Sequence, residues 1–417
     1  MFFDILLFNS SSTGNKSLNQ LAVEAKSEHG IIISKQGIDK RFNDGALNFI
    51  QNLIEKQLSI ELVKQFDVGW FSFFNRVRIK DGTRFDIPEQ FEIYLPGMGG
   101  SASNAGICIQ FEYDLKSGNI IYLNLTPAKR PDSRDAMEVL DNIAKGDLII
   151  RDLGYHAMKS FLNIIDKEAY FISRLHPCTN AYQKKGQTLQ ELDYKAIYKK
   201  MKKNNLQLIH KDVYVGKEAK IPARLVIELL PDTIFAERMR KVKKKNAKKG
   251  YKNNDEYADR AKFNLFITNV PENIIPNEVV SSLYRIRWQI ELVFKIWKSV
   301  IGIHNTQRMK YKRWKCLLYT KLLVMIINWN IIMTHRTIFY NKLGRLLSPN
   351  KSFKTLNDNI YRLRKAIKGG MESKVNFIKW ITETLSEKHW LEKKNKTLGF
   401  EKILYLFYCK SNIYAYI

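Results

Sequence analysis

The sequence is poor in cysteine, and its few cysteines are not spaced as metal ligands or disulfide partners. Four occur among 417 residues: Cys108, Cys178, Cys316 and Cys409. They form no CxxC pair, so the sequence predicts neither a disulfide framework nor a zinc finger. His176 and Cys178 share a His-Pro-Cys stretch, but a structural zinc site needs four ligands, and we interpret this pair as incidental.

Long apolar runs are also missing. The most apolar stretch, residues 316–333, is interrupted by Lys321, Asn328 and Asn330, whereas a membrane-spanning helix needs about 20 mostly apolar residues. We therefore expect a buried helix there and no membrane partner. The first residues, MFFDILLF, are too short for the apolar region of an export signal and carry Asp4 in place of basic residues. The expected compartment is the cytoplasm.

Acidic residues are scarce relative to basic ones. The chain has 41 Asp and Glu against 69 Lys and Arg, a net charge of +28. The excess is confined to one part, because residues 1–180 carry a net charge of −2 and residues 181–417 carry +30. A basic segment of that size is typical of a protein that binds a polyanion, either nucleic acid or an anionic membrane.

The N-terminal residues have helical patterns. Residues 17–28 carry apolar side chains at helical spacing, Ser34 is placed to cap a second helix, KQGIDKRF, and a longer helix, GALNFIQNLIEKQL, follows. Helices joined by a glycine turn suit a helix-turn-helix DNA module or an ordinary three-helix cap. The near-zero charge of this segment favours the cap.

The pattern changes at residue 74. FNRVRIK alternates as a half-buried strand does, residues 106–127 read as a hairpin around Asp114 to Gly118, and GDLIIRDL and AYFISRL are further strands. Helical segments SRDAMEVLDNIAKG and YHAMKSFLNIIDKEA separate the later strands. Three strands, helix, strand, helix, strand predict an α/β core with a mixed sheet.

Residues 176–262 interrupt this regular order. They hold Lys-rich helical pieces, an expected strand pair around DVYVGKE and ARLVIELL, and the run KVKKKNAKKGYKNN, which we predict to be an exposed loop, either solvated or facing DNA. A strand, NLFITNV, then returns to the core pattern, and a long helix is expected from about Glu278 to Gly302. The remainder is helical and basic.

Two carboxylates are expected at strand ends. Asp81 follows FNRVRIK, and Asp152 follows the apolar strand that begins at Asp147. Carboxylates at strand ends lie in the cleft above an α/β sheet, where they can hold Mg²⁺ together with phosphate oxygens. Strands also end in Asp simply to begin a turn. Four further acids compete for the role: Asp86, Asp132, Asp135 and Asp147.

A polar stripe is expected on the helix YRIRWQIELVFKIWK. Four residues fall within about 60° of one another around a regular helix axis: Tyr284, Arg287, Glu291 and Lys298. Three others cover the remaining faces and can anchor the helix in the core: Trp288, Ile290 and Phe294. The stripe is a poor core face, and it suits either a functional site or a solvated face with an ion pair such as Arg287–Glu291.

The spacing Tyr284-x2-Arg287-x3-Glu291-x6-Lys298 resembles the Y-R-E-K signature of insertion-sequence transposases, in the cut-and-paste DDE group numbered four. The stretches KDGTRF, LIIRDLGY and FITNVP are similar to the other blocks of that family. The resemblance covers roughly residues 17–310.

The resemblance implies a fold and its boundaries. The expected core is ribonuclease H-like, α/β, and formed by residues 73–175 and 263–310, with a β-rich insertion domain at residues 176–262. An N-terminal helical region at residues 1–72, which can be a helix-turn-helix, and a C-terminal helical region at residues 311–417 would flank it. Family members usually begin with a longer DNA-binding segment, so a shortened N-terminus is also expected.

The resemblance further implies a catalytic triad, Asp81, Asp152 and Glu291, that binds Mg²⁺, with Mn²⁺ as a substitute. Asp86 competes for the first position, but Asp81 fits the family's block better. Two metal ions would activate water, then a 3′-hydroxyl, for phosphoryl transfer on DNA.

DNA contacts are implied for the same helix. Tyr284, Arg287, Lys295 and Lys298 would grip phosphates near the cut. Trp288 or Phe263 can stack on a base flipped out for the hairpin intermediate known in the family, although core packing is favoured for both. The loop LPGMGGSASNAG can approach the DNA backbone, and it lacks the GK[ST] of an ATP-binding loop.

The resulting hypothesis is a bacterial transposase, associated with the nucleoid, that acts on double-stranded DNA. Its partners would be terminal inverted repeats and target DNA, with a homodimer in the synaptic complex. Two alternatives stay open. A non-catalytic remnant would keep DNA binding without transposition, and an unrelated metal-dependent nuclease would cut without end specificity.

Overall fold

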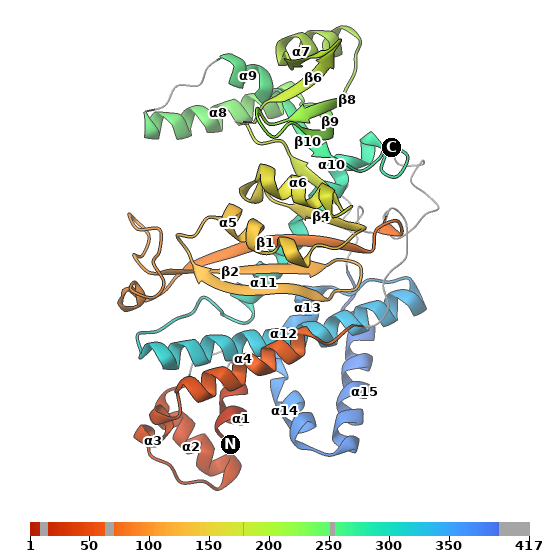
Figure 1. The fold of residues 1–417 in the computed structure, drawn as a ribbon. Helices are drawn as coiled ribbons and strands as arrows, with labels where there is room; N and C mark the ends of the chain where they lie inside the picture. Colours follow the sequence, from red (N-terminus) through yellow and green to blue (C-terminus); the bar gives the residue numbers. More distant parts are fainter. Residues whose placement is uncertain (9–15, 63–70, 178, 251–254, 392–417) are drawn as a thin grey trace. The chain divides into compact units, whose positions relative to one another are not determined.

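The protein is a mixed α/β chain of two compact units (Figure 1). The computed structural model describes residues 1–8, 16–62, 71–177, 179–250 and 255–391. The first unit takes its described residues from 1–66, 81–130 and 288–402, and the second takes them from 67–80 and 131–287. Strand β1 (Arg76–Asp86) is divided between them after Lys80.

The first unit begins with short helices whose starts are fixed by side-chain caps. The helices are α1 (Phe2–Leu7), α2 (Leu18–His29), α3 (Lys35–Lys40) and α4 (Asp44–Leu58). Ser17 accepts a hydrogen bond from the Gln20 amide, and the Gln20 side chain accepts one from the Ser17 amide, which is a capping box. Ser34 and Asn43 cap α3 and α4 through the amide three residues on. These observations confirm the predicted helices and the Ser34 cap.

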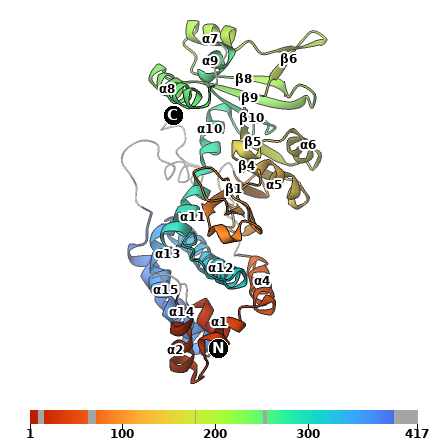
Figure 2. The same ribbon diagram turned by 90° about the vertical axis from the view of Figure 1, so that its left-hand side faces the viewer.

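A long buried helix forms the centre of the later part of the first unit. The helices here are α11 (Trp288–Ser299), α12 (Tyr311–Leu343), α13 (Pro349–Asp358), α14 (Ile360–Lys368) and α15 (Met371–Lys388). Helix α12 packs along α4 (Figures 1 and 2). In the described chain, α12 is the one helix long and apolar enough to cross a membrane, and 78% of its most apolar window is buried. This confirms the buried helix predicted for residues 316–333.

The first unit also contains the predicted hairpin. Strands β2 (Gly106–Asp114) and β3 (Ile120–Pro127) are antiparallel, and β2 lies between β3 and the Asp81–Asp86 part of β1. The Asp114 carboxylate accepts hydrogen bonds from the amides of Lys116 and Ser117 and from the Ser117 hydroxyl, which closes the turn. The indole Nε1 of Trp329 donates to the carbonyl oxygen of Gly118 at 2.7 Å, so α12 holds the turn in place.

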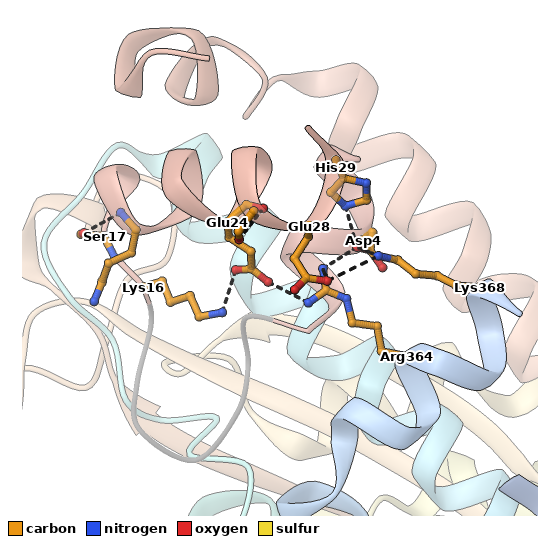
Figure 3. A network of polar contacts seen from close by, with 10 residues as sticks. Asp4, Lys16, Ser17, Glu24, Glu28, His29, Arg364 and Lys368 are labelled. Atoms are coloured by element: carbon orange, nitrogen blue, oxygen red, sulfur yellow. Dashed lines mark hydrogen bonds and ion pairs between the residues drawn. The ribbon is translucent and has the colours of Figure 1, made fainter. Parts of the chain in front are cut away.

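An ion-pair network joins α1 and α2 to α14 (Figure 3). The Arg364 guanidinium lies 2.6 Å from an Asp4 oxygen and 2.9 Å from a Glu24 oxygen, and Lys368 and His29 also contact Asp4, at 3.0 and 2.8 Å. Burial alone would raise the pKa of Asp4, but hydrogen bonds from Arg364, Lys368 and His29 hold it below its ordinary value. The network therefore joins the N-terminal helices of the first unit to α14, more than 300 residues later in the sequence.

The second unit is built on one sheet with strand order β1-β4-β5-β10-β9-β8-β6-β7. The strands beyond β1 are β4 (Asp147–Arg151), β5 (Tyr170–Arg174), β6 (Ala181–Lys185), β7 (Thr188–Glu191), β8 (Leu208–Val215), β9 (Ile221–Leu229) and β10 (Phe263–Thr268). The β1-β4 and β4-β5 pairs are parallel, and the remaining pairs are antiparallel. The mixed sheet and the strand pair of β8 and β9 are as predicted.

Helices cover this sheet. They are α5 (Asp132–Glu138), α6 (Met158–Asp166), α7 (Tyr194–Lys203), α8 (Asp232–Lys249), α9 (Asp255–Ala261) and α10 (Asn277–Arg285). Alternate residues of β9 and β10, such as Leu225, Ile227, Leu265 and Ile267, are buried with apolar side chains of α6 and α7 in one core. A two-residue period on the strands thus supplies one apolar face for the helices to cover.

The predicted loop in the Lys-rich run is wrong for most of its length. KVKKKNAKK forms the end of helix α8, and Gly250, at φ +69°, terminates it. Lys, Arg and Ala are strong helix formers, which explains why a run without apolar periodicity is still helical. The side chains of Lys243, Lys244 and Lys245 are exposed. The rest of the run, residues 251–254, lies outside the described residues.

The single long helix predicted over residues 278–302 is also wrong. It is broken between α10 and α11. The amides of Ile286 and Arg287 donate to carbonyls three residues earlier, at 3.0 and 3.1 Å, which is the tighter 3₁₀ pattern and interrupts the regular ladder. Tyr284 therefore precedes the break, Arg287 lies in it, and Glu291 and Lys298 follow it, so the four residues do not form one straight stripe.

Candidate active site

In the first unit, Asp81 and Glu291 line one pocket of about 570 Å³. Asp81 comes from β1 and Glu291 from α11, and both side chains are half-buried. Three basic residues share the pocket: Lys295, Lys298 and His304. The sequence placed Asp81 at a strand end, but β1 continues to Asp86, so Asp81 projects from the middle of the strand. The pocket is thus lined by two carboxylates, which are potential ligands of a hard metal ion, and by three basic side chains.

The backbone around Asp81 is held closely. The amide of Gly82 donates to Asp81 Oδ1 at 2.8 Å. A Cβ at position 82 would lie 3.0 Å from the sulfur of Cys108 and 3.1 Å from Gln110 Nε2, so glycine lets β1 approach β2 at this point. Lys298 Nζ donates to the carbonyl oxygen of Arg84 at 3.1 Å, which fastens α11 to the same strand.

Aromatic packing orients α11. Trp297 is fully buried and its ring centroid lies 4.8 Å from that of Phe111 on β2, and Phe294 packs beside both. With this face and Ile290 buried, Glu291, Lys295 and Lys298 are left on the pocket side. Trp288 was expected to help anchor the helix, but 53% of it is exposed because it begins α11 directly after the break. The core role predicted for Trp288 is therefore wrong.

In the second unit, Asp152 is held by the two signature residues that come before α11, Tyr284 and Arg287. The hydroxyl of Tyr284 donates to Asp152 Oδ1 at 3.3 Å, and Arg287 Nε lies 3.4 Å from the same oxygen. Burial, then the Asp152 charge, raises the pKa of Tyr284 well above its ordinary value, so the phenol stays a donor. The Asp152 side chain is 44% exposed, so the carboxylate keeps access to solvent.

The matching family model, described as a transposase DDE domain, covers residues 72–329. The chain belongs to the DDE transposase family. It is 32% identical over 379 residues to the transposase of insertion sequence element IS231B from Bacillus thuringiensis subsp. berliner, covering 87% of this chain and 79% of that protein.

Two other comparisons are more distant. The transposase of IS1151 from Clostridium perfringens is 28% identical over 376 residues, covering 85% of this chain and 78% of that protein. A cryo-EM structure of the piggyBac transposase synaptic complex with hairpin DNA covers 95% of this chain and 77% of its own, with a TM-score of 0.46 and 11% identity.

As a DDE transposase the chain is an enzyme that cleaves DNA and transfers phosphoryl groups. Two of the four acids that were alternatives to Asp81 and Asp152 as metal ligands form buried ion pairs instead. Asp147 is fully buried and pairs with Arg76 at 2.6 Å and Arg78 at 3.1 Å, and Asp135 is fully buried and lies 2.5 Å from Lys80 Nζ. A metal ion would have to displace these cations, so both acids are poor ligands.

The remaining candidates of this transposase are placed as follows. Asp86 is exposed at the end of β1, and Asp132 lies in the first turn of α5. Phe263 is buried in the core of the second unit, as predicted, and is closed to a base. The glycine-rich loop 95–106 is folded back on itself, since the amides of Gly97 and Gly106 donate to the carbonyls of Asn104 and Leu95.

DDE transposases generally use divalent metal ions. The donors present suit such an ion, because Asp81, Asp152 and Glu291 offer carboxylate oxygens with solvent access, the ligands that Mg²⁺ prefers. Asp81 and Glu291 belong to the first unit and Asp152 to the second. Within the described part of either unit, no three His, Cys, Asp or Glu side chains gather as a complete metal site. The grouping of all three acids stays a prediction.

Proposed function

We propose that this enzyme moves an insertion sequence by cut-and-paste transposition, with Asp81, Asp152 and Glu291 as its catalytic, metal-binding acids. The observation that supports this most directly is the pocket that Asp81 and Glu291 share, from separate elements, with lysines at its rim. The Y-R-E-K spacing supplies Asp152 with two partners in the second unit. The proposed core is ribonuclease H-like and carries the insertion at residues 176–262.

The three acids would hold Mg²⁺, which supplies Lewis-acid activation of the attacking oxygen and charge stabilisation at the scissile phosphate. The chain's own residues set up that chemistry. Tyr284 and Arg287 fix the orientation of the Asp152 carboxylate, and Lys298 fixes α11 against β1, so that Glu291 keeps its position relative to Asp81. These are positioning roles that precede any DNA contact.

Lys295 is the clearest direct DNA contact among the predicted residues. It is exposed on the pocket side of α11 and makes no hydrogen bond or ion pair to another described side chain. A lysine in that position offers a point charge to a phosphate near the cut. Trp288, exposed at the start of the same helix, is available to stack on a base, which a hairpin intermediate requires.

The test is cleavage of duplexes that carry the element's own terminal repeats. Asp81→Asn, Asp152→Asn and Glu291→Gln should each reduce Mg²⁺-dependent cleavage to background while the protein still binds the duplex. Asp86→Asn is the matched control, because Asp86 is an exposed acid on the same strand, and it should cleave normally. The triad would be refuted if the Glu291→Gln variant still cleaved the duplex. It would also be refuted if cleavage were lost only in the Asp86→Asn variant.

The wild-type enzyme separates the alternatives. Strand transfer by a complex with two ends, sedimenting as a dimer on DNA, supports cut-and-paste transposition. Tight binding of the repeats without cleavage or strand transfer identifies a non-catalytic remnant, and cutting of any duplex regardless of its ends identifies a general nuclease. Binding by the basic part should weaken with salt, at about −0.9 in log–log slope for each phosphate contacted.

A further inference from the structure

A second pocket, in the second unit, is lined by three arginines. It has a volume of about 300 Å³, and its cationic side chains are Arg174 at the end of β5, Arg238 on α8 and Arg260 on α9. Its floor is apolar, with Phe263 and Leu265 from β10. No acidic side chain is among its lining residues.

Neutral oxygens hold two of these arginines in place. Arg238 Nη1 donates to the carbonyl oxygens of Ala261 and Phe263, at 2.9 and 2.8 Å, and Nη2 donates to Asn264 Oδ1 at 2.7 Å. Arg260 Nη2 donates to the carbonyl oxygens of residues 176 and 179, at 2.7 and 2.8 Å. Such bonds fix a guanidinium without neutralising its charge.

The third arginine, Arg174, adds positive charge to the pocket, but its side chain has no hydrogen-bond partner among the described residues. Among the side chains that the structure describes, Arg174 donates no hydrogen bond and forms no ion pair, and none of the three guanidinium groups has a carboxylate partner. Burial lowers the pKa of Arg238, and the neighbouring charge of Arg174 lowers it further. Three like charges at one half-buried pocket oppose one another, and an anion would relieve that repulsion.

The pocket adjoins the proposed acid of this unit. Leu153, the residue after Asp152, lines it. Arg174 is also close enough to Tyr284 to lower the pKa of that phenol, against the larger effect of burial, and Tyr284 donates to Asp152. Exposed basic side chains continue along α8 after Arg238, so positive charge extends along that helix.

We infer that Arg174, Arg238 and Arg260 form a binding site for a backbone phosphate of the DNA strand that passes Asp152. The planar guanidinium fork matches a phosphate, and the pocket is at the small end of ligand sites, so it accepts a single phosphate with its sugar and excludes a duplex. The inference rests on the proposed function for the identity of its ligand, and it assigns the insertion a direct part in holding the cut strand.

Binding of a single-stranded 12-mer, measured by fluorescence anisotropy without Mg²⁺, tests the site separately from catalysis. Arg174→Gln should weaken binding about tenfold and make the log–log salt slope shallower by about 0.7, the value for one phosphate on a single strand. Arg134→Gln is the matched control, because Arg134 is an exposed arginine of the same unit paired with Glu138. It should change affinity less than twofold.

A 12-mer with neutral methylphosphonate linkages completes the design. If Arg174 reads a phosphate charge, this probe should bind the wild-type chain weakly, and Arg174→Gln should weaken it no further. If Arg174→Gln weakens binding of the charged and the neutral 12-mer equally, the substitution acts through packing. If the Arg174→Gln and Arg134→Gln variants bind the charged 12-mer with equal affinity, the site is refuted. Removing Arg174 breaks no described hydrogen bond of its side chain, so the variant is expected to fold.

Chemical protection gives a readout on the unmodified chain. Phenylglyoxal should modify Arg174 in the free protein, and the charged 12-mer should slow that reaction at least about fivefold. Unchanged modification under saturating DNA would also refute the site. Loss of cleavage in the triad variants tests the proposed function and leaves these binding results unaffected, so the two proposals fail independently.

Discussion

His156 should make the second unit less stable in mild acid. Its ring packs edge-on against Phe161, with centroids 5.0 Å apart, and its Nε2 lies 3.4 Å from the Thr179 hydroxyl. Burial, with smaller effects from the charges of His176 and Arg260, lowers the pKa of His156 from 6.5 to about 4. The folded unit therefore resists a proton that the unfolded chain accepts.

The sign and size of the effect follow from that difference. Between pH 6.5 and pH 4 the unfolded chain binds more protons than the folded one, so stability is complete above the unfolded pKa and falls as the pH is lowered. A shift from 6.5 to about 4 makes the folded state about 2 kcal/mol less stable at pH 5 than at pH 8 through His156 alone. His156→Asn cannot titrate and should lose this part of the pH dependence.

Hydrogen exchange read by mass spectrometry is the suitable assay, because it reports protection strand by strand within the second unit, whereas six of the seven tryptophans belong to the first unit. The quantity to compare is the fall in protection of β5 and β10 from pH 8 to pH 5, corrected for intrinsic exchange. Thr179→Val should keep the wild-type fall, since it removes a neighbour and not the titrating group. An equal fall in His156→Asn and wild type would refute the reasoning.

Two further substitutions test buried contacts. Asp135→Asn should destabilise the second unit by about 3–5 kcal/mol, because it removes a buried charge that lies 2.5 Å from the buried Lys80 ammonium. Hydrogen exchange in β1 measures the loss, and Lys80→Met combined with Asp135→Leu should recover most of it. Trp329→Phe should lower the free energy of unfolding of the first unit by about 1–3 kcal/mol, because the Gly118 carbonyl loses its donor. Urea unfolding followed by the fluorescence of the remaining tryptophans measures this loss. An unchanged midpoint would contradict that role for the indole.

The parts of the fold that the sequence predicted are those set by local chemistry. Ser34 caps its helix through the amide three residues away, and the Asp114 turn closes through its own carboxylate, so each signal lies within a few residues. The Y-R-E-K spacing was informative as a pattern, but its geometry was not predictable. The break at Ile286 depends on two short-range amide bonds and on the burial of that side chain, which no spacing reveals.

The arginine pocket was not predictable for a different reason. Arg174, Arg238 and Arg260 are far apart in the chain, and two of them are fixed by backbone carbonyls, which every residue carries. In the sequence they are three among 69 basic residues. The DNA contact of Lys298 stays a prediction, and its ammonium also donates to the Arg84 carbonyl, a partner that only the folded chain brings near.

The discontinuous first unit has a consequence for synthesis on the ribosome. Helix α4 ends at Leu58, and its packing partner α12 begins at Tyr311, about 250 residues later. At about 5–20 residues per second, the apolar face of α4 waits on the order of 10–50 s for that partner. The helices of the second unit and most of its sheet are meanwhile complete by Arg287, so we expect this unit to fold first. The nascent transposase would then carry a folded second unit while α4 and the β2-β3 hairpin still lack their packing partners in α12.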